Sequence, residues 1–310
     1  MRALRAVLAR TLEAAAVMLA MATLVFFALR LLPGDPARLL LGDQASPAEL
    51  AALRAELGLN HPLYVQYAHF LRGLVTFDLG ASLRHPGVPA ARLVLASVVP
   101  TSELAATAVG LAGIGGTLAA VLATGPFLGR RRVWVERAAV AVASTPLLSF
   151  APLATYVLAV RLRIAPLPGD PDAGAAGLLL ASSMLAVPLA AHVARVGRAA
   201  LEDVARAQFL VAARARGASL ARTWLVHAVP PALGPILAVV ASQLGALLGG
   251  AVVLERLFER PGLGTLILDA YASRDMPVLE GAIVAAGALF VLVQIAATAL
   301  HAMVDPRARA

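Results

Sequence analysis

The sequence contains no cysteine, no lysine and few charged side chains of either sign. The absence of cysteine excludes disulfides, cysteine-ligated zinc, iron–sulfur clusters and thiol catalysis. Only 14% of the 310 residues are charged, whereas a soluble domain is usually about a quarter charged. The chain is also 60% hydrophobic, and the deficit of charge extends along most of its length. These proportions indicate an integral membrane protein.

All 26 basic side chains are arginine, and the formal net charge is +8. A basic chain could bind nucleic acid, but these arginines lie between apolar stretches, where topology signals occur. Membrane orientation is therefore the better explanation. The lack of lysine also excludes the phosphate-binding loop Gly-x-x-x-x-Gly-Lys-Ser/Thr, so any ATP must be hydrolysed elsewhere.

Six apolar stretches reach or approach the length of about 20 residues that a helix needs to cross a bilayer. Backbone groups cannot stay unpaired in lipid, so the sequence predicts an all-α integral membrane protein with six transmembrane helices. The first stretch follows a basic start like that of a signal peptide, but the small-residue cleavage site is not where it should be, and we predict a retained helix. The predicted spans are Ala14–Leu29, Leu104–Leu128, Ala138–Val160, Ala173–Ala194, Ala228–Leu254 and Gly281–Val304.

Six helices place both termini on one side of the membrane. Arginines are dense at both termini, at Arg130–Arg132 and between Arg195 and Arg222, so we predict that these segments are cytoplasmic. The long loop from about residue 30 to residue 99 is then outside. It contains a predicted amphipathic helix, Pro47–Leu57, preceded by the capping residue Ser46.

We predict one membrane domain over residues 1–310. Residues 1–97 would form the first helix and the outer loop, and residues 98–304 a five-helix core. The largest cytoplasmic loop of that core would be residues 195–227.

That cytoplasmic loop reads as a short helix, a break at Gly217 and a second helix that leads into the next span. Glycine tolerates a positive φ, so Gly217 can terminate the first helix. A helix–turn–helix of this kind can dock into a groove of a partner, since alanines allow close approach and arginines pair with acids. The alternative is a basic loop that only fixes topology. The candidate docking residues are Ala212, Ala213, Arg214, Ala215, Arg216, Gly217, Ala218, Ser219, Leu220 and Arg222.

Polar side chains are rare within the spans. Gln243 and Gln294 lie mid-span, where they could face a translocation pathway or, more commonly, form hydrogen bonds between helices. Glu13 and Glu103 lie near span ends. An ion-coupled secondary transporter would normally place an acid or histidine at the midplane and show repeated halves, and neither is evident. An intramembrane hydrolase would need a nucleophile–base pair or a motif such as His-Glu-x-x-His, and none is found.

The loop around Gly217 resembles the cytoplasmic coupling loop of binding-protein-dependent ABC importer permeases. Their motif is Glu-Ala-Ala, three residues, Gly and then an apolar stretch ending near a proline. Ala212-Ala213, Gly217 and Pro230 stand at matching positions, while Val211 replaces the glutamate. That departure, with the run Ala213–Gly217 reading Ala-Arg-Ala-Arg-Gly, is similar to the peptide and nickel branch of the family.

The resemblance extends over nearly the whole chain and is to the first of two permeases, the kind with a long first outer loop. The outer motifs also have a local explanation as turns that shape loops, about as good as direct contact with a partner. In order, the motifs that carry the resemblance are Leu32–Pro36, Leu57–Asn60 with Pro62–Tyr67, Asp78–Ser82, Gly249–Glu255, Pro261–Gly264, Arg274–Val278 and Asp305–Arg307.

This resemblance implies a type I ABC importer permease fold and a transport subunit that is not itself an enzyme. The chain would form half of a translocation pathway for peptides or similar small solutes, with nickel chelates and sugars as alternatives. The implied partners are a second homologous permease, two ABC ATPase subunits that hold ATP and Mg²⁺, an extracytoplasmic solute-binding protein and membrane lipid. We expect no cofactor, metal or nucleic acid on this chain, and a bacterial-type inner membrane as its location.

Overall fold

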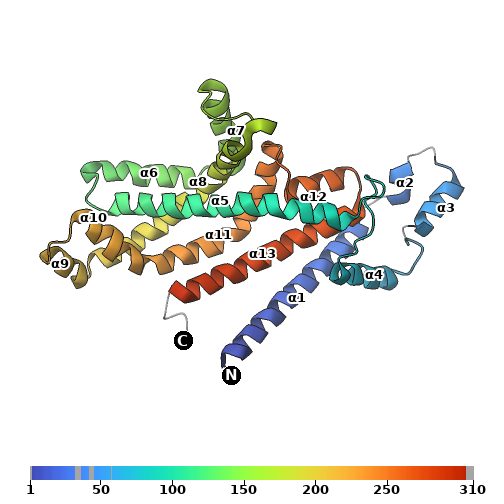
Figure 1. Ribbon diagram of the computed structural model, residues 1–310, viewed down its shortest axis with the longest axis horizontal. Coiled ribbons are helices and arrows are strands. Elements are labelled where there is room, and N and C mark those ends of the chain that lie inside the picture. The colour runs from blue at the N-terminus through green and yellow to red at the C-terminus, as the bar shows by residue number, and fades with distance from the viewer. Residues whose placement is uncertain (1, 32–35, 42–44, 57, 305–310) are drawn as a thin grey trace. The chain divides into compact units, whose positions relative to one another are not determined.

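The computed structural model describes residues 2–31, 36–41, 45–56 and 58–304. The chain packs as two compact units, described separately: unit 1 is Met1–Pro100 with Pro261–Val291, and unit 2 is Thr101–Arg260 with Leu292–Ala310. The described residues are helical apart from turns, loops and one isolated bridge between Ala81 and Pro89, which confirms the all-α fold (Figure 1). The division predicted near residue 97 stays a prediction.

Unit 1 is built around the first helix. Its aromatic side chains hold the fourth helix in place, since the ring centroids of Tyr67 and Phe70 lie 5.2 and 5.4 Å from that of Phe26. The hydroxyl groups of Thr23 and Tyr67 are 2.6 Å apart, and Phe26 is fully buried. The helices of the unit are α1 (Arg2–Arg30), α2 (Pro36–Leu41), α3 (Pro47–Glu56), α4 (Leu63–Thr76), the start of α5 (Ala90–Thr124), α12 (Leu263–Ala272) and most of α13 (Met276–Val304).

The predicted outer helix is present as α3, with Leu57 outside the described residues. It begins in a reciprocal capping arrangement. The Glu49 backbone N–H donates to the Ser46 hydroxyl oxygen at 3.3 Å, and the Ser46 N–H donates to the Glu49 carboxylate at 2.8 Å. The Ser46 side chain, followed by its backbone N–H, holds the pKa of Glu49 below its ordinary value.

The turn that begins at Pro261 leads into α12. Leu266 and Ile267 on this helix pack with its buried residue Ala270 against Ala90, Val278 and Leu279. The apolar face of α12 is thus covered within unit 1. Two other motifs of the resemblance lie wholly or mostly outside the described residues. They are Leu32–Pro36, of which residues 32–35 are not described, and Asp305–Arg307.

Unit 2 is centred on two long helices, α8 and α11, that pack along each other (Figure 1). Small residues also allow α5 to lie close to α8. A side chain at Gly116 of α5 would meet the Ala190 carbonyl oxygen of α8 at 2.6 Å. The unit contains the rest of α5, α6 (Arg132–Ala143), α7 (Leu147–Thr155), α8 (Gly174–Ala205), α9 (Gln208–Ala215), α10 (Leu220–Arg222), α11 (Val229–Leu257) and the end of α13, with π-helical turns at Tyr156–Arg161 and Thr223–Ala228.

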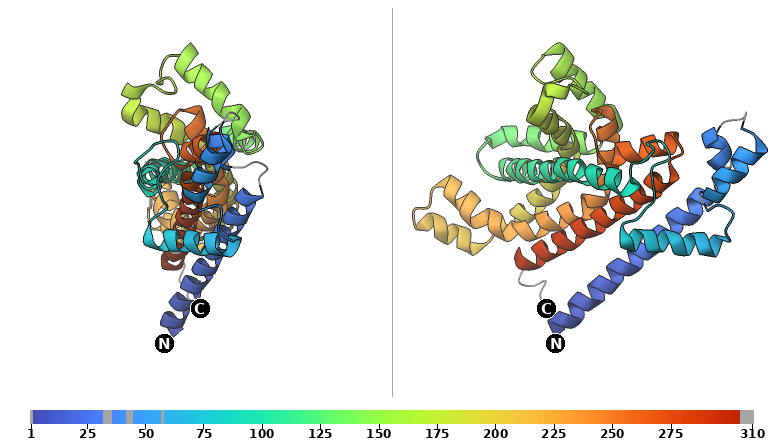
Figure 2. Two further views of the ribbon diagram at one scale, coloured as in Figure 1. Left: turned by 90° about the vertical axis from the view of Figure 1, so that its right-hand side faces the viewer. Right: turned by 45° about the vertical axis from the view of Figure 1, so that its right-hand side comes forward.

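The prediction of one continuous span over Ala138–Val160 is wrong. The chain there forms two helical segments, Gly129–Ala143 and Leu147–Arg161, with an angle of 111° between them (Figure 2). The break has a local cause at Pro146, because a residue before proline avoids the α conformation. The hydroxyls of Ser144 and Thr145 also bond to carbonyls one turn back, at 2.9 and 2.8 Å, and compete with helix continuation.

Five helices in the described ranges are long and apolar enough to cross a membrane, or six if the bent pair counts as one span. Several extend beyond the predicted limits. α5 begins at Ala90, 14 residues before Leu104, and α8 continues to Ala205. The predicted limits follow the apolar stretches, which mark only the part of a helix that lipid can surround. Charged residues such as Arg92 and Glu103 do not interrupt the helical backbone, so the helices continue past those limits.

Candidate functional site

The predicted docking loop is a sharp turn between α9 and α10 that backbone hydrogen bonds close. Gly217 has φ +84°, so the predicted positive φ is confirmed. The Ala218 N–H donates to the Ala213 carbonyl at 3.1 Å, and the Gly217 N–H donates to the Arg214 carbonyl at 2.9 Å. These two bonds form a Schellman motif, which needs a left-handed residue at the position of Gly217.

The next helical turn starts at once. Ser219 caps it, since its hydroxyl oxygen accepts from the Arg222 N–H at 3.3 Å. The backbone then passes through the π-helical turn Thr223–Ala228 into α11. α9 is therefore connected to a long helix through a short and well-defined turn, so a displacement of one can be transmitted to the other.

The loop presents a mixed apolar and basic surface. Leu210 and Ala213 are buried and fix α9 to the rest of unit 2, so Ala213 of the candidate set is an anchor. Phe209 and Val211 expose 46% and 66% of their surface, and neither is among the docking residues predicted from the sequence. Of the other candidate residues, Ala218 is half-buried, and those exposed are Ala212, Arg214, Ala215, Arg216, Gly217, Ser219, Leu220 and Arg222.

The two mid-span glutamines stay open candidates. Gln243 lies on α11 and Gln294 on α13, and both are half-buried. Half-burial suits either a pathway lining or a hydrogen bond between helices, so their role stays a prediction.

An ion pair that the sequence argument did not anticipate lies in unit 1. Arg30, at the end of α1, meets Glu280 of α13 with Nη1 and Oε1 2.7 Å apart. The Arg30 Nε–H also donates to Gln66 of α4 at 3.2 Å, and its guanidinium lies 3.4 Å from the ring centroid of Phe26. Opposite charges at the ends of two predicted spans, Arg30 after Leu29 and Glu280 before Gly281, are the signal that could have suggested it.

Two buried acids also went unpredicted, although both stand in the outer motifs. Glu255 is 1% exposed, and the Thr101 hydroxyl donates to it at 2.6 Å. Asp275 is 2% exposed and accepts from the Ser82 hydroxyl and from the Arg84 N–H. Buried carboxylates of this kind need such donors. These motif residues thus have a structural role within each unit.

Comparison with known proteins agrees with this architecture. Residues 113–310 match the family described as "Binding-protein-dependent transport system inner membrane component", and residues 3–91 match its N-terminal membrane component. A glutathione transport system permease protein, GsiC of Escherichia coli, is 34% identical over 291 residues, covering 92% of each chain. A probable peptide ABC transporter permease protein, y4tP of Sinorhizobium fredii, is 32% identical over 313 residues, covering 98% of each.

A solved structure supports the fold. The crystal structure of an amino acid ABC transporter with histidines aligns with a TM-score of 0.50 and 18% identity, covering 70% of this chain and 94% of that chain. The relatives are ABC permeases and not ion-coupled carriers. The chain is accordingly a multi-pass transmembrane subunit of an ABC importer in an inner membrane, and such an importer works with ATPase and solute-binding partners.

The family matches begin near the N-terminus and continue to the C-terminus, and both relatives align over nearly their full length. The chain therefore belongs to the inner membrane components of binding-protein-dependent transport systems, as a permease of the peptide and nickel branch.

Proposed function

We propose that the α9–α10 turn is the surface through which an ATPase subunit drives this permease. The observation that carries the proposal is the Schellman turn at Gly217, which ends a short helix that exposes Phe209, Val211 and Arg214. Exposed apolar side chains and guanidinium groups on one short helix and turn suit a groove that has both apolar and acidic walls. The match to the coupling-loop motif is a second, independent support.

The solutes that we propose are peptides or similarly sized peptide-like molecules, because the relatives are named as glutathione and peptide permeases. The chain would form half of the pathway, paired with a second homologous permease. ATP and Mg²⁺ would be held by two separate ATPase subunits, and the permease itself would carry out no catalysis. Closure of those subunits would move the α9–α10 turn and rock the helices between outward and inward openings.

The proposed orientation has both termini, Arg130–Arg132 and the α9–α10 turn in the cytoplasm, and α3 outside. The arginine distribution supports it. Because the chain has no cysteine, single introduced cysteines can report it without further changes. A membrane-impermeant maleimide applied to intact cells should label Ala55→Cys, next to Arg54, and should leave Arg131→Cys unlabelled until the membrane is opened. If only Arg131→Cys were labelled from outside, the orientation would be the opposite of the proposed one.

The docking surface can be tested by cross-linking. Val211→Cys carrying a short photoactivatable cross-linker should form a permanent adduct with the ATPase subunit in the assembled importer. Arg131→Cys is the matched control, since it is also exposed and is also placed in the cytoplasm but lies outside the turn. Equal adduct yields at the two positions, or no adduct at Val211→Cys, would show that the α9–α10 turn is not the surface that docks on the ATPase.

A further inference from the structure

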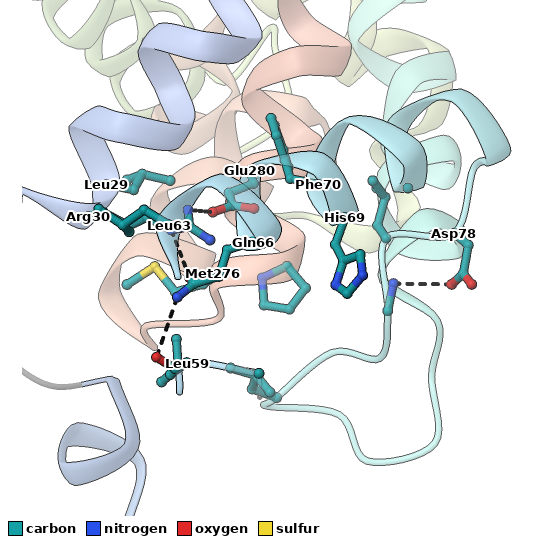
Figure 3. Close-up of a pocket in the computed structure, with 16 residues that line it drawn as sticks. Leu29, Arg30, Leu59, Leu63, Gln66, His69, Phe70, Asp78, Met276 and Glu280 are labelled. Atoms are coloured by element: carbon teal, nitrogen blue, oxygen red, sulfur yellow. Dashed lines mark hydrogen bonds and ion pairs between the residues drawn. The ribbon is translucent and has the colours of Figure 1, made fainter. Parts of the chain in front are cut away.

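Unit 1 contains a cavity of about 540 Å³ that no sequence motif and no comparison assigns to a function. It lies among the end of α1, the segment before α4, one face of α4, the loop at residues 78–83 and the start of α13 (Figure 3). Leu59, Leu63, Phe70 and Met276 supply apolar walls. Apolar walls with a few convergent polar groups, at this size, are typical of sites for small molecules.

One end of the cavity carries the ion pair of Arg30 and Glu280. The Arg30 Nε–H donates to Gln66, and its Nη1 group donates to the Phe26 carbonyl and to Glu280 Oε1. Within the described ranges, these bonds leave the two N–H groups of Arg30 Nη2 for another acceptor. Gln66 is itself fixed, since its amide donates to the Leu59 and His61 carbonyls at 3.4 and 2.9 Å.

The other end of the cavity carries Asp78. Figure 3 places Arg30 and Glu280 at one end and Asp78 at the other, with Gln66 and His69 between them. Asp78 is exposed, and its Oδ1 accepts the Gly80 N–H at 3.3 Å. Its Oδ2 is bonded to none of the described residues, so it can take a cationic group.

We propose that this cavity binds a short zwitterionic solute of the amino-acid or small-peptide type. The carboxylate of the solute accepts from Arg30 Nη2, its ammonium group lies at Asp78, and its side chains lie against the apolar walls. The proposal rests on the peptide-like solute class proposed above, and it adds a site separate from the α9–α10 turn.

The direct test uses the assembled importer in nanodiscs, without the solute-binding protein and without ATP. The probe is radiolabelled Ala-Ala, measured by equilibrium dialysis at millimolar concentrations. We expect saturable binding that Asp78→Asn weakens about five- to tenfold, since the amide keeps the bond to Gly80 but loses the charge. Asp172→Asn, which removes an exposed acid outside the cavity, should bind as the parent does. N-acetyl-Ala-Ala and Ala-Ala amide should each bind more weakly than Ala-Ala.

A second variant separates binding from folding. The exchange Arg30→Glu with Glu280→Arg keeps an ion pair between α1 and α13 but moves the guanidinium to the other helix. We expect it to restore the yield and Tm lost in Arg30→Gln, without restoring Ala-Ala binding. Restored binding, equal binding in Asp78→Asn, or equal binding of the blocked peptides would overturn the proposal. The solute class is tested separately, by peptide uptake through the full importer. If the importer takes up peptides but the cavity binds no Ala-Ala, only the cavity proposal is rejected. If the cavity binds Ala-Ala but the importer takes up no peptide, the proposed solute class is rejected.

Discussion

Replacement of Gly217 by valine is the sharpest test of the turn between α9 and α10. Gly217 has φ +84°, and a Cβ atom built there meets no other heavy atom within 4 Å. Within this chain the added side chain has room, so its cost to the turn itself comes from the backbone conformation. A left-handed conformation costs an ordinary L-residue roughly 1–2 kcal/mol, and it is most unfavourable for a β-branched side chain.

That cost shifts the equilibrium between the closed and the open form of the turn. The turn is closed by the two bonds from the Gly217 and Ala218 N–H groups, at 2.9 and 3.1 Å. A penalty of roughly 1–2 kcal/mol shifts the ratio of closed to open turn by about 5- to 30-fold. The helices of unit 2 are packed by other residues, so membrane insertion and expression should not change. We expect Gly217→Val to lose most ATP-driven transport and part of its association with the ATPase.

The matched variant is Gly217→Asn, because asparagine tolerates the left-handed region far better than valine. It should retain most transport. The assay is solute uptake in proteoliposomes, with the amount of co-purified ATPase measured in the same preparations. If Gly217→Val inserts normally, keeps its ATPase and transports at the parental rate, the coupling assignment is wrong. If asparagine and valine are equally harmful, the backbone explanation fails.

Three further predictions concern packing, buried polarity and pH. Gly116→Ala should lower the free energy of unfolding by about 1–3 kcal/mol, because its Cβ meets a backbone carbonyl. Gly110→Ala is the control: its Cβ has open space around it, so thermal unfolding should show a neutral or slightly stabilising effect. Thr101→Val should cost about 1.5–3 kcal/mol by removing a donor to the buried glutamate on α11, and Thr101→Ser should restore most of it. The pKa of Glu49 is held below its ordinary value of 4.5, so the α3 cap is complete above that pH and is lost as the pH falls through the lowered pKa. A ¹³C NMR titration of Glu49 should find its pKa returned toward 4.5 in Ser46→Ala.

Local rules were sufficient where the cause of a structure is local. The helix α3 and its cap follow from Ser46 and Glu49, three residues apart, and the turn at Gly217 follows from a glycine between two helical segments. The membrane class follows from composition and from the length of the apolar stretches, because lipid leaves helices as the simplest way to satisfy the backbone. The break at Pro146 was also local, and it was missed because hydropathy was followed without weighing the proline within the span.

What the sequence alone determined was thus the all-α membrane class, the approximate spans and the α9–α10 turn. The tertiary structure alone decided which distant residues meet. Arg30 and Glu280 are separated by 250 positions, and Ser82 and Asp275 by 193. No local preference can bring such pairs together, since their approach depends on how whole helices pack and on the need of each buried charge for a partner. The cavity of unit 1 arises in the same way: its walls come from five separate segments of the chain, and it exists only once those segments have packed.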